Sequence, residues 1–74
     1  MNCASRIRAL REDHDFSQKY IASVLHVAQT TYSDYEKGKV RIPLDSVIIL
    51  AELYDVNLDY IAGISNEKIP FPKR

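Results

Sequence analysis

The sequence has little of what several common kinds of protein require. Its 74 residues include one cysteine, Cys3, so the chain has no partner for an internal disulfide. No apolar run approaches the roughly 18 residues that a membrane-spanning helix needs. Arg6, Arg8 and Arg11 interrupt the N-terminal segment, which is therefore not expected to be a secretory signal. A single small domain is expected at this length, and these absences predict that it is cytoplasmic.

Sites for catalysis and for metal ions are missing as well. The chain has no glycine-rich phosphate loop, no pair of nucleophile and base, and barely enough residues to form a pocket. His14 and His26, taken with Cys3, lack the spacing of zinc ligands. We therefore expect no enzyme activity, no catalytic residue, no metal and no cofactor, and no small-molecule ligand is evident.

The formal net charge is zero, but the charges are distributed unevenly along the chain. Residues 17–42 carry four basic and two acidic side chains, which leaves a charge of +2. Residues 43–67 carry five acidic side chains and no lysine or arginine. The basic cluster favours a nucleic-acid partner. Chance clustering on a solvated surface is the alternative, and charge alone does not decide between the two.

Apolar residues recur at helical spacing along most of the chain, and no segment alternates with the period of two that is typical of a strand. The pattern predicts an all-α domain over residues 1–65, followed by a C-terminal tail over residues 66–74. Five helices are expected, at about residues 3–14, 18–25, 29–37, 43–54 and 58–62. The fourth is so apolar that we expect it to be buried on more than one side and to form the centre of the domain.

Residues that begin or end helices stand at several of these boundaries. Ser17 is a suitable N-cap for the second helix. Asp15 tolerates the left-handed backbone that ends the first helix, and Gly38 suits the position after the third. Pro43 fits the first turn of the fourth helix. Four boundaries therefore coincide with residue types that favour them.

Residues 17–38 contain two short helical patterns separated by a break at residues 26–28. In the second pattern Tyr32 and Tyr35 recur at the spacing of core residues. The opposite face carries side chains that can bond to base edges, namely Gln29, Thr30, Ser33 and Asp34. Two short helices with such an outward face predict a helix-turn-helix that reads the major groove of double-stranded DNA.

Four strings along the chain resemble the Cro/phage-repressor (XRE) family of helix-turn-helix domains: LRED…FSQ, IASVLHVAQTTYSDYEKGK, IP and LAELYDVNLDYIAG. The resemblance covers about Arg6 to Gly63, nearly the whole chain. It implies a compact five-helix bundle of the lambda-repressor-like type that sets the third helix into the major groove as a homodimer. It further implies a sequence-specific transcriptional regulator, acting as a repressor on a near-palindromic operator whose half-sites lie about 34 Å apart.

The resemblance gives several single residues an expected role. Gln18 matches a position that contacts a DNA phosphate and braces the first residue of the reading helix, here Gln29. Arg11 and Glu36 match a partly buried ion pair between the first and third helices, and a planar guanidinium suits a carboxylate. Three basic residues match the loop that grips the DNA backbone, namely Lys37, Lys39 and Arg41.

Three residues depart from the pattern of this family. His26 stands where the family prefers glycine, so it must adopt left-handed backbone at some strain. Ala28 replaces the usual Ser or Thr cap of the reading helix, which costs about 1 kcal/mol. Asp34 brings a carboxylate close to phosphates that repel it. We expect it to accept a hydrogen bond from cytosine N4, which adds specificity at a cost in affinity.

Apolar residues near the C-terminus indicate where a dimer would form: Leu58, Ile61, Ile64, Ile69 and Phe71. The alternative is that the tail packs on its own core, and the sequence favours neither. A second alternative concerns function. The neutral net charge, Asp34 and the acidic C-terminal half would also suit a protein-interaction module, such as an antitoxin or a regulatory subunit.

Overall fold

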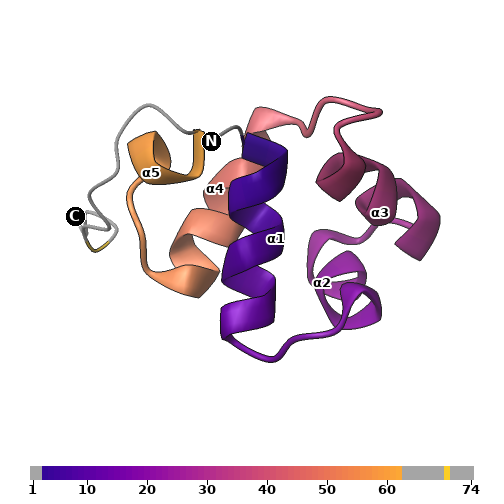
Figure 1. Ribbon diagram of the computed structural model, residues 1–74, viewed down its shortest axis with the longest axis horizontal. Coiled ribbons are helices and arrows are strands. Elements are labelled where there is room, and N and C mark those ends of the chain that lie inside the picture. Colours follow the sequence, from indigo (N-terminus) through magenta and orange to yellow (C-terminus); the bar gives the residue numbers. More distant parts are fainter. Residues whose placement is uncertain (1–2, 63–69, 71–74) are drawn as a thin grey trace.

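The computed structural model describes residues 3–62 and Pro70, and every regular element among them is a helix. The helices are α1 (Cys3–Asp13), α2 (Gln18–Leu25), α3 (Gln29–Lys37), α4 (Leu44–Tyr54) and α5 (Leu58–Ala62). α1 runs through the middle, with α2 and α3 on one side and α4 and α5 on the other (Figure 1). The expected all-α fold is confirmed. The expected domain limit at residue 65 and the tail at residues 66–69 and 71–74 lie outside the described residues.

Two helix boundaries differ by one residue from those expected. α1 ends at Asp13 rather than His14, because the chain turns into left-handed backbone at Asp15, where φ is 57°. α4 begins at Leu44, and Pro43 precedes it as the N-cap with extended backbone, φ −63° and ψ 151°. Proline suits this place since it has no N–H to leave unbonded.

The two ends of α2 differ in how well their residues suit them. The Ser17 hydroxyl accepts a hydrogen bond from the Tyr20 N–H at 3.0 Å and so caps the start of the helix. At the other end His26 has left-handed backbone, φ 59° and ψ 41°. Gly38 ends α3 in a similar conformation, with φ 74°. Glycine adopts this conformation freely and histidine does not, so the strain lies at His26.

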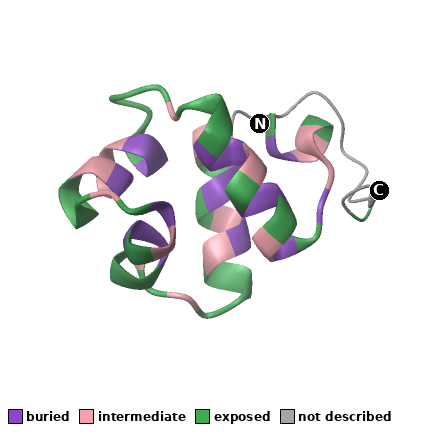
Figure 2. Ribbon diagram, turned by 180° about the vertical axis from the view of Figure 1, so that it is seen from behind, coloured by how far each residue is buried: buried purple, intermediate pink, exposed green. Residues whose placement is uncertain are grey.

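The core forms where α1 meets the other helices. Each of the five helices contributes buried side chains to the core, and these side chains form one continuous cluster (Figure 2). Burial of such a side chain contributes about 1.5–3 kcal/mol, so the helices stabilise one another. Six large apolar side chains of the described residues are almost completely inaccessible: Ile7, Leu10, Ile21, Tyr32, Leu50 and Ile61.

α4 is less buried than its composition predicts. Leu44 is 67% exposed and Ile49 is 39% exposed, while Val47, Leu50 and Ala51 face the core. The expectation that α4 is the central helix is therefore wrong. α1 takes that place, because it packs against both α3 and α5. Part of the apolar surface of α4 consequently stays uncovered by the described residues.

Aromatic contacts hold the connection between α1 and α2. The His14 ring lies 5.0 Å from the Tyr54 ring and 5.7 Å from the Phe16 ring, measured between centroids. The Phe16 ring lies 4.9 Å from that of Tyr20. Tyr20 therefore covers the connection after α1, and the cluster fixes α2 relative to α1 and α4.

One buried charge is not predicted by the periodicity. Arg6 is 5% exposed, and its guanidinium carbon lies 4.1 Å from the centre of the Tyr60 ring. A cation over an aromatic face is attracted by the negative charge of that face. This contact joins α1 to α5. The spacing of apolar residues along the sequence does not predict this contact, because it joins two residues that are 54 positions apart.

Replacing Ala28 by serine should stabilise the domain. Ala28 precedes α3 with extended backbone, φ −67° and ψ 150°, and provides no side-chain cap. A serine at this position can accept a hydrogen bond from a free N–H of α3, which contributes about 1 kcal/mol. We expect Ala28→Ser to raise the melting temperature. The matched variant Ser17→Ala removes the cap of α2 and should lower it by a similar amount. A lower melting temperature for Ala28→Ser would contradict this account.

Candidate nucleic-acid interface

The turn between α2 and α3 sets the direction of α3. The Val27 N–H donates to the Ala22 carbonyl at 3.0 Å and closes the end of α2. Tyr32 is fully buried and Tyr35 nearly so, and their rings meet edge to face with centroids 6.3 Å apart. The two tyrosines therefore determine which side of α3 faces outward.

The outward side of α3 carries the four residues predicted to read bases. Gln29 and Thr30, in the first turn, are exposed, while Ser33 and Asp34, one turn later, are half-buried. Residues three and four apart lie on one helix face, so the four form a polar strip. The strip offers both donors and acceptors to base edges. Because the Ala28 side chain makes no cap, N–H groups at the start of α3 are available to a phosphate.

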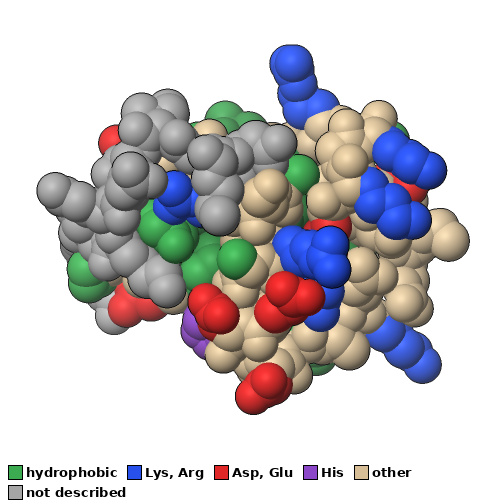
Figure 3. Space-filling model, viewed as in Figure 1, with side chains coloured by type: hydrophobic (Ala, Val, Ile, Leu, Met, Phe, Trp, Pro, Cys, Tyr) green, Lys and Arg blue, Asp and Glu red, His purple; other side chains and the backbone are tan. Residues whose placement is uncertain are grey.

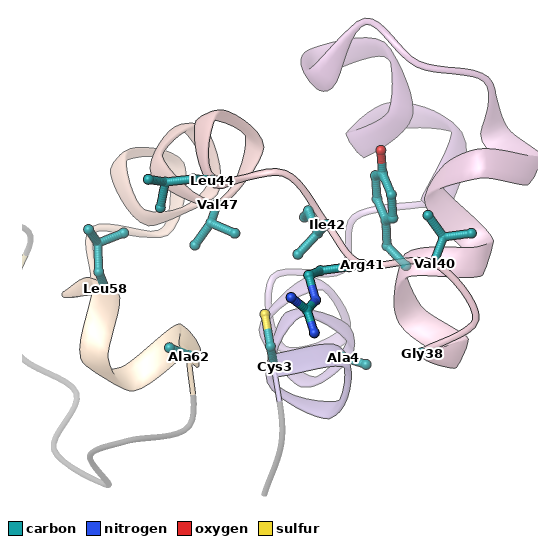
Figure 4. Close-up of a pocket in the computed structure, with 11 residues that line it drawn as sticks. Cys3, Ala4, Gly38, Val40, Arg41, Ile42, Leu44, Val47, Leu58 and Ala62 are labelled. Carbon is teal, nitrogen blue, oxygen red and sulfur yellow. The ribbon is translucent and has the colours of Figure 1, made fainter.

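Basic side chains gather on the half of the molecule that carries α2 and α3 (Figure 3). Lys19 in α2, Lys37 in α3 and Lys39 just after it are all exposed. Arg41 is also exposed, but its guanidinium extends from the α3–α4 connection over the first turn of α1 (Figure 4). There it lines an apolar groove. The structure thus places Arg41 between the basic surface and this groove.

Three helices meet at the carboxylate of Glu36. Its Oε2 lies 2.6 Å from Arg11 Nε and its Oε1 lies 3.2 Å from Arg11 Nη2, a bidentate pair between α3 and α1. The Gln18 amide of α2 donates to Oε1 at 3.0 Å. Arg11 Nη1 also donates to the Phe16 carbonyl at 2.9 Å. The structure therefore brings together Arg11 and Glu36, with side chains only 14% and 3% exposed.

Burial and pairing act in opposite directions on Glu36. Burial disfavours the charged carboxylate, but hydrogen bonds from Arg11 and Gln18 outweigh it and hold the pKa of Glu36 below its usual value. The bond to Glu36 in turn raises the pKa of Arg11. Burial raises the pKa of Tyr32 and of Tyr54, and the Glu36 charge adds to both shifts. At neutral pH the ion pair is therefore charged and both tyrosines are neutral.

The hydrogen bond of Gln18 differs from the one that the resemblance implied. Gln18 donates to Glu36, and the described residues show no hydrogen bond between Gln18 and Gln29, the first residue of α3. The physical reason is that a buried carboxylate attracts a donor more strongly than a neutral amide does. The contact of Gln18 with a DNA phosphate stays a prediction.

The burial of α5 alters the predicted dimer surface. Ile61 is fully buried and packs inward because α5 lies against α1 and α4, so its assignment to a dimer surface is wrong. Leu58 is half-buried and lines the same groove as Arg41. The other three predicted residues lie outside the described part of the chain: Ile64, Ile69 and Phe71.

Two helices joined by a tight turn, with the second facing outward, match a known family. A family model described as Helix-turn-helix matches residues 7–61, which is most of the chain. The chain belongs to the helix-turn-helix family. The resemblance to the Cro/phage-repressor (XRE) type that the sequence indicated is thereby confirmed.

Several helix-turn-helix proteins are similar to the chain over most of its length. It is 38% identical over 69 residues to the uncharacterized HTH-type transcriptional regulator YobD of Bacillus subtilis, which covers 93% of this chain and 62% of YobD. It is 34% identical over 68 residues to the HTH-type transcriptional regulator AnsR of the same organism, covering 92% of this chain and 59% of AnsR. The chain is also 35% identical over 66 residues to the cryptic phage CTXphi transcriptional repressor RstR of Vibrio cholerae. This match covers 89% of this chain and 60% of RstR. The chain thus spans about three fifths of the length of these relatives.

A solved structure shares the helix-turn-helix fold. The crystal structure of a transcriptional regulator from Listeria innocua matches with a TM-score of 0.82 and covers 89% of this chain and 62% of that chain. At 24% identity this likeness concerns the fold alone. The names of the three sequence relatives describe regulators, so the alternative of a protein-interaction module is not favoured.

The described residues carry neither a helix able to span a membrane nor a cluster of metal ligands. α1 and α4 have only 11 residues each. Among residues 3–62, no three His, Cys, Asp or Glu side chains come together as they would around a metal ion. Burial raises the pKa of the Cys3 thiol, so this cysteine is not activated as a nucleophile.

Glu36→Ala should destabilise the domain by about 3 kcal/mol, because it leaves the largely buried guanidinium of Arg11 without its carboxylate. The free energy of unfolding in urea measures the loss. Glu12→Ala is the matched control, since the Arg8–Glu12 pair at 3.4 Å joins side chains that are 63% and 54% exposed. Such exposed pairs contribute about 0–1 kcal/mol. Equal losses of unfolding free energy in the two variants would contradict a stabilising role of Glu36.

Acid should weaken the domain through Glu36. Its pKa is lower in the folded chain than in the unfolded chain, where the usual value is about 4.3. The stabilisation is therefore complete above that value and is lost as the pH falls through the lower folded pKa. We expect urea titrations at a series of pH values to show this fall, with a smaller fall in Glu36→Gln. The same pH dependence in both proteins would contradict the assignment.

Proposed function

We propose that the chain is a sequence-specific regulator of transcription that binds double-stranded DNA and acts as a repressor. The observation that carries the proposal is the polar outward face of α3, held in place by buried tyrosines and the Glu36 contacts. α3 enters the major groove, which is wide enough to admit a helix. The names of the relatives, HTH-type transcriptional regulators and a transcriptional repressor, support this assignment.

The chemistry of each side chain indicates its partner on DNA. Gln29 bonds bidentately to adenine N6 and N7, while Thr30 and Ser33 contact a thymine methyl or a base edge. Asp34 accepts from cytosine N4. Phosphate contacts orient the domain without reading sequence, and they come from residues with donors at the surface: Gln18, Lys37, Lys39 and Arg41. The amide of Gln18 has a second N–H for this purpose beside the one given to Glu36.

The proposed active form is a homodimer on a near-palindromic operator. Two copies then place their α3 helices in successive major grooves, about 34 Å apart. The domain measures 30 × 24 × 22 Å, so two copies side by side fit this separation. The cytoplasmic location and the absence of catalysis expected from the sequence belong to the same proposal.

Selection of bound sequences from a random pool of duplexes at low salt tests this function. We expect an enriched palindrome with two half-sites about 10 base pairs apart, centre to centre. Gln29→Ala should lose the preference for adenine at one position of each half-site, a discrimination of about 1–3 kcal/mol. Glu12→Ala is the control and should select the wild-type motif. Binding without any enrichment would leave only phosphate contacts, and no binding would refute the function.

Asp34→Ala should raise the affinity for non-specific DNA and relax one base preference. The substitution removes a carboxylate that phosphates repel and that accepts a bond from one cytosine. Dissociation constants for the selected operator and for a scrambled duplex, each at two salt concentrations, measure the effect. Glu52→Ala removes an exposed acidic group of α4 and should leave the ratio of the two constants unchanged. Equal weakening on both duplexes in Asp34→Ala would contradict the reading role.

A further inference from the structure

An apolar groove of about 720 Å³ opens between the start of α1, the α3–α4 connection and α5 (Figure 4). The sequence does not indicate this groove, because its walls come from segments that are far apart in the chain. A volume of about 300–1,000 Å³ is typical of the sites that bind small molecules. We propose that the groove binds a small apolar carboxylate, a hydrocarbon or aromatic body with one acidic group, and that this ligand regulates the binding of DNA.

The walls of the groove suit the apolar body of such a ligand. Two buried residues of the core, Tyr35 and Val47, line it together with the half-buried Leu58. Val40 and Leu44 also line it and are 48% and 67% exposed, so they form its rim. Removing apolar surface from water is favourable, and a hydrocarbon body in the groove would cover both the walls and the rim. The groove therefore favours a ligand that is mostly apolar.

One charged side chain faces this apolar surface. Arg41 is the only charged residue among the described residues that line the groove. Its guanidinium is directed from the α3–α4 connection toward the start of α1, where Cys3 and Ala4 lie (Figure 4). Within the described part of the chain, no carboxylate forms an ion pair with Arg41. A guanidinium forms bidentate, charge-assisted hydrogen bonds with a carboxylate, so a ligand with this group at one end supplies a partner for Arg41.

The single charge of the groove favours a carboxylate over a phosphate. A carboxylate brings one negative charge, which one guanidinium neutralises. A phosphate monoester brings about 1.5–2 negative charges at neutral pH. The excess charge would lie beside apolar walls, where an unpaired charge is costly. The ligand class is therefore a monoanion with an apolar body, such as a medium-chain fatty acid or an aryl carboxylate.

The groove adjoins the helix that is proposed to read DNA. A Cβ atom at Gly38 would lie 3.9 Å from the Cβ of Ala4, so the end of α3 meets the first turn of α1 at the groove. Arg41 is also one of the residues proposed to contact a DNA phosphate. A ligand carboxylate at Arg41 neutralises the charge that attracts this phosphate, so ligand and DNA should oppose each other. This regulatory part rests on the proposed function, whereas the binding of the ligand does not.

Titration of the isotopically labelled chain with sodium octanoate, in the absence of DNA, tests the ligand site. Amide chemical shifts in NMR spectra measure the affinity and locate the site. We expect saturable binding with the largest changes at the residues that line the groove. Octanol has the same hydrocarbon chain without the charge and should bind about tenfold more weakly or worse, and acetate should not bind. Absence of saturable octanoate binding, or equal affinities for octanoate and octanol, would overturn the proposal.

Two pairs of variants test which residues hold the ligand. Arg41→Gln removes the charge and should weaken octanoate binding by about tenfold or more. Lys39→Gln changes an exposed basic residue that does not line the groove and should bind octanoate as the wild-type chain does. Val40→Glu adds a carboxylate at the rim and should weaken binding by about tenfold. Its control is Ile49→Glu, since Ile49 is 39% exposed but does not line the groove.

Circular dichroism establishes that all four variants are folded. An octanoate affinity that Arg41→Gln leaves unchanged would overturn the recognition of the carboxylate. A wild-type chain that binds no octanoate, but whose mass in sedimentation equilibrium falls on Val40→Glu and not on Ile49→Glu, would show that a second copy occupies the groove. That result would also overturn the ligand site.

Operator titrations at several salt concentrations test the regulatory part. Each phosphate contact contributes about 0.9 to the slope of the logarithm of the association constant against the logarithm of the salt concentration. With acetate at the same concentration as the reference, we expect saturating octanoate to lower this slope by about one, as Arg41→Gln does. Octanoate should have no further effect on Arg41→Gln. An operator affinity and slope that octanoate leaves unchanged in the wild-type chain would overturn the regulation.

The ligand site and the DNA-binding function fail separately, because the octanoate titration contains no DNA. A chain that binds octanoate in the groove but binds no duplex contradicts the DNA function and leaves the ligand site intact. A chain that binds the operator but no octanoate contradicts the ligand site alone.

Discussion

The Glu36 carboxylate accepts hydrogen bonds from Arg11 in α1 and Gln18 in α2, and the placement of α3 depends on these bonds. α3 has nine residues, too few for a stable helix alone in water, so it keeps its shape through tertiary contacts. A buried charge is tolerated only when it is paired and its remaining lone pairs are bonded. Loss of either donor therefore affects the relative positions of three helices, not one local contact.

The two faces of α3 have opposite requirements. The inward face packs against the core through Tyr32 and Tyr35 and bonds to the other helices through Glu36. These contacts hold the helix in place, so the polar groups of the outward face are available to a ligand. Two local departures lie just before this helix: left-handed backbone at His26 and the absence of a side-chain cap at Ala28. Both reduce stability next to the candidate interface. A helix start without a side-chain cap also leaves its N–H groups available to a phosphate. The missing cap therefore lowers stability but is compatible with the proposed binding of DNA.

Part of the apolar surface of α4 remains uncovered by the described residues. A domain of this length buries only about 60% of the surface of its unfolded chain. α1, with its several arginines, lies at the centre, whereas Leu44 and Ile49 of the more apolar α4 stay exposed.

The sequence by itself determined the five helices, the inward tyrosines of α3 and the left-handed positions after α1 and α3. These features follow from periodicity, capping and the backbone preferences of single residues, all of which act locally. The left-handed backbone after α2, at His26, was expected only from the family resemblance. The Arg11–Glu36 pair was available only through the family resemblance. The tertiary structure decided that α1 is central, that Ile61 belongs to the core, that Gln18 bonds to Glu36 and that Arg6 packs on Tyr60. Each of these features depends on which faces of the helices pack against one another. That packing is determined by contacts between residues far apart in the chain, which a local sequence pattern does not contain.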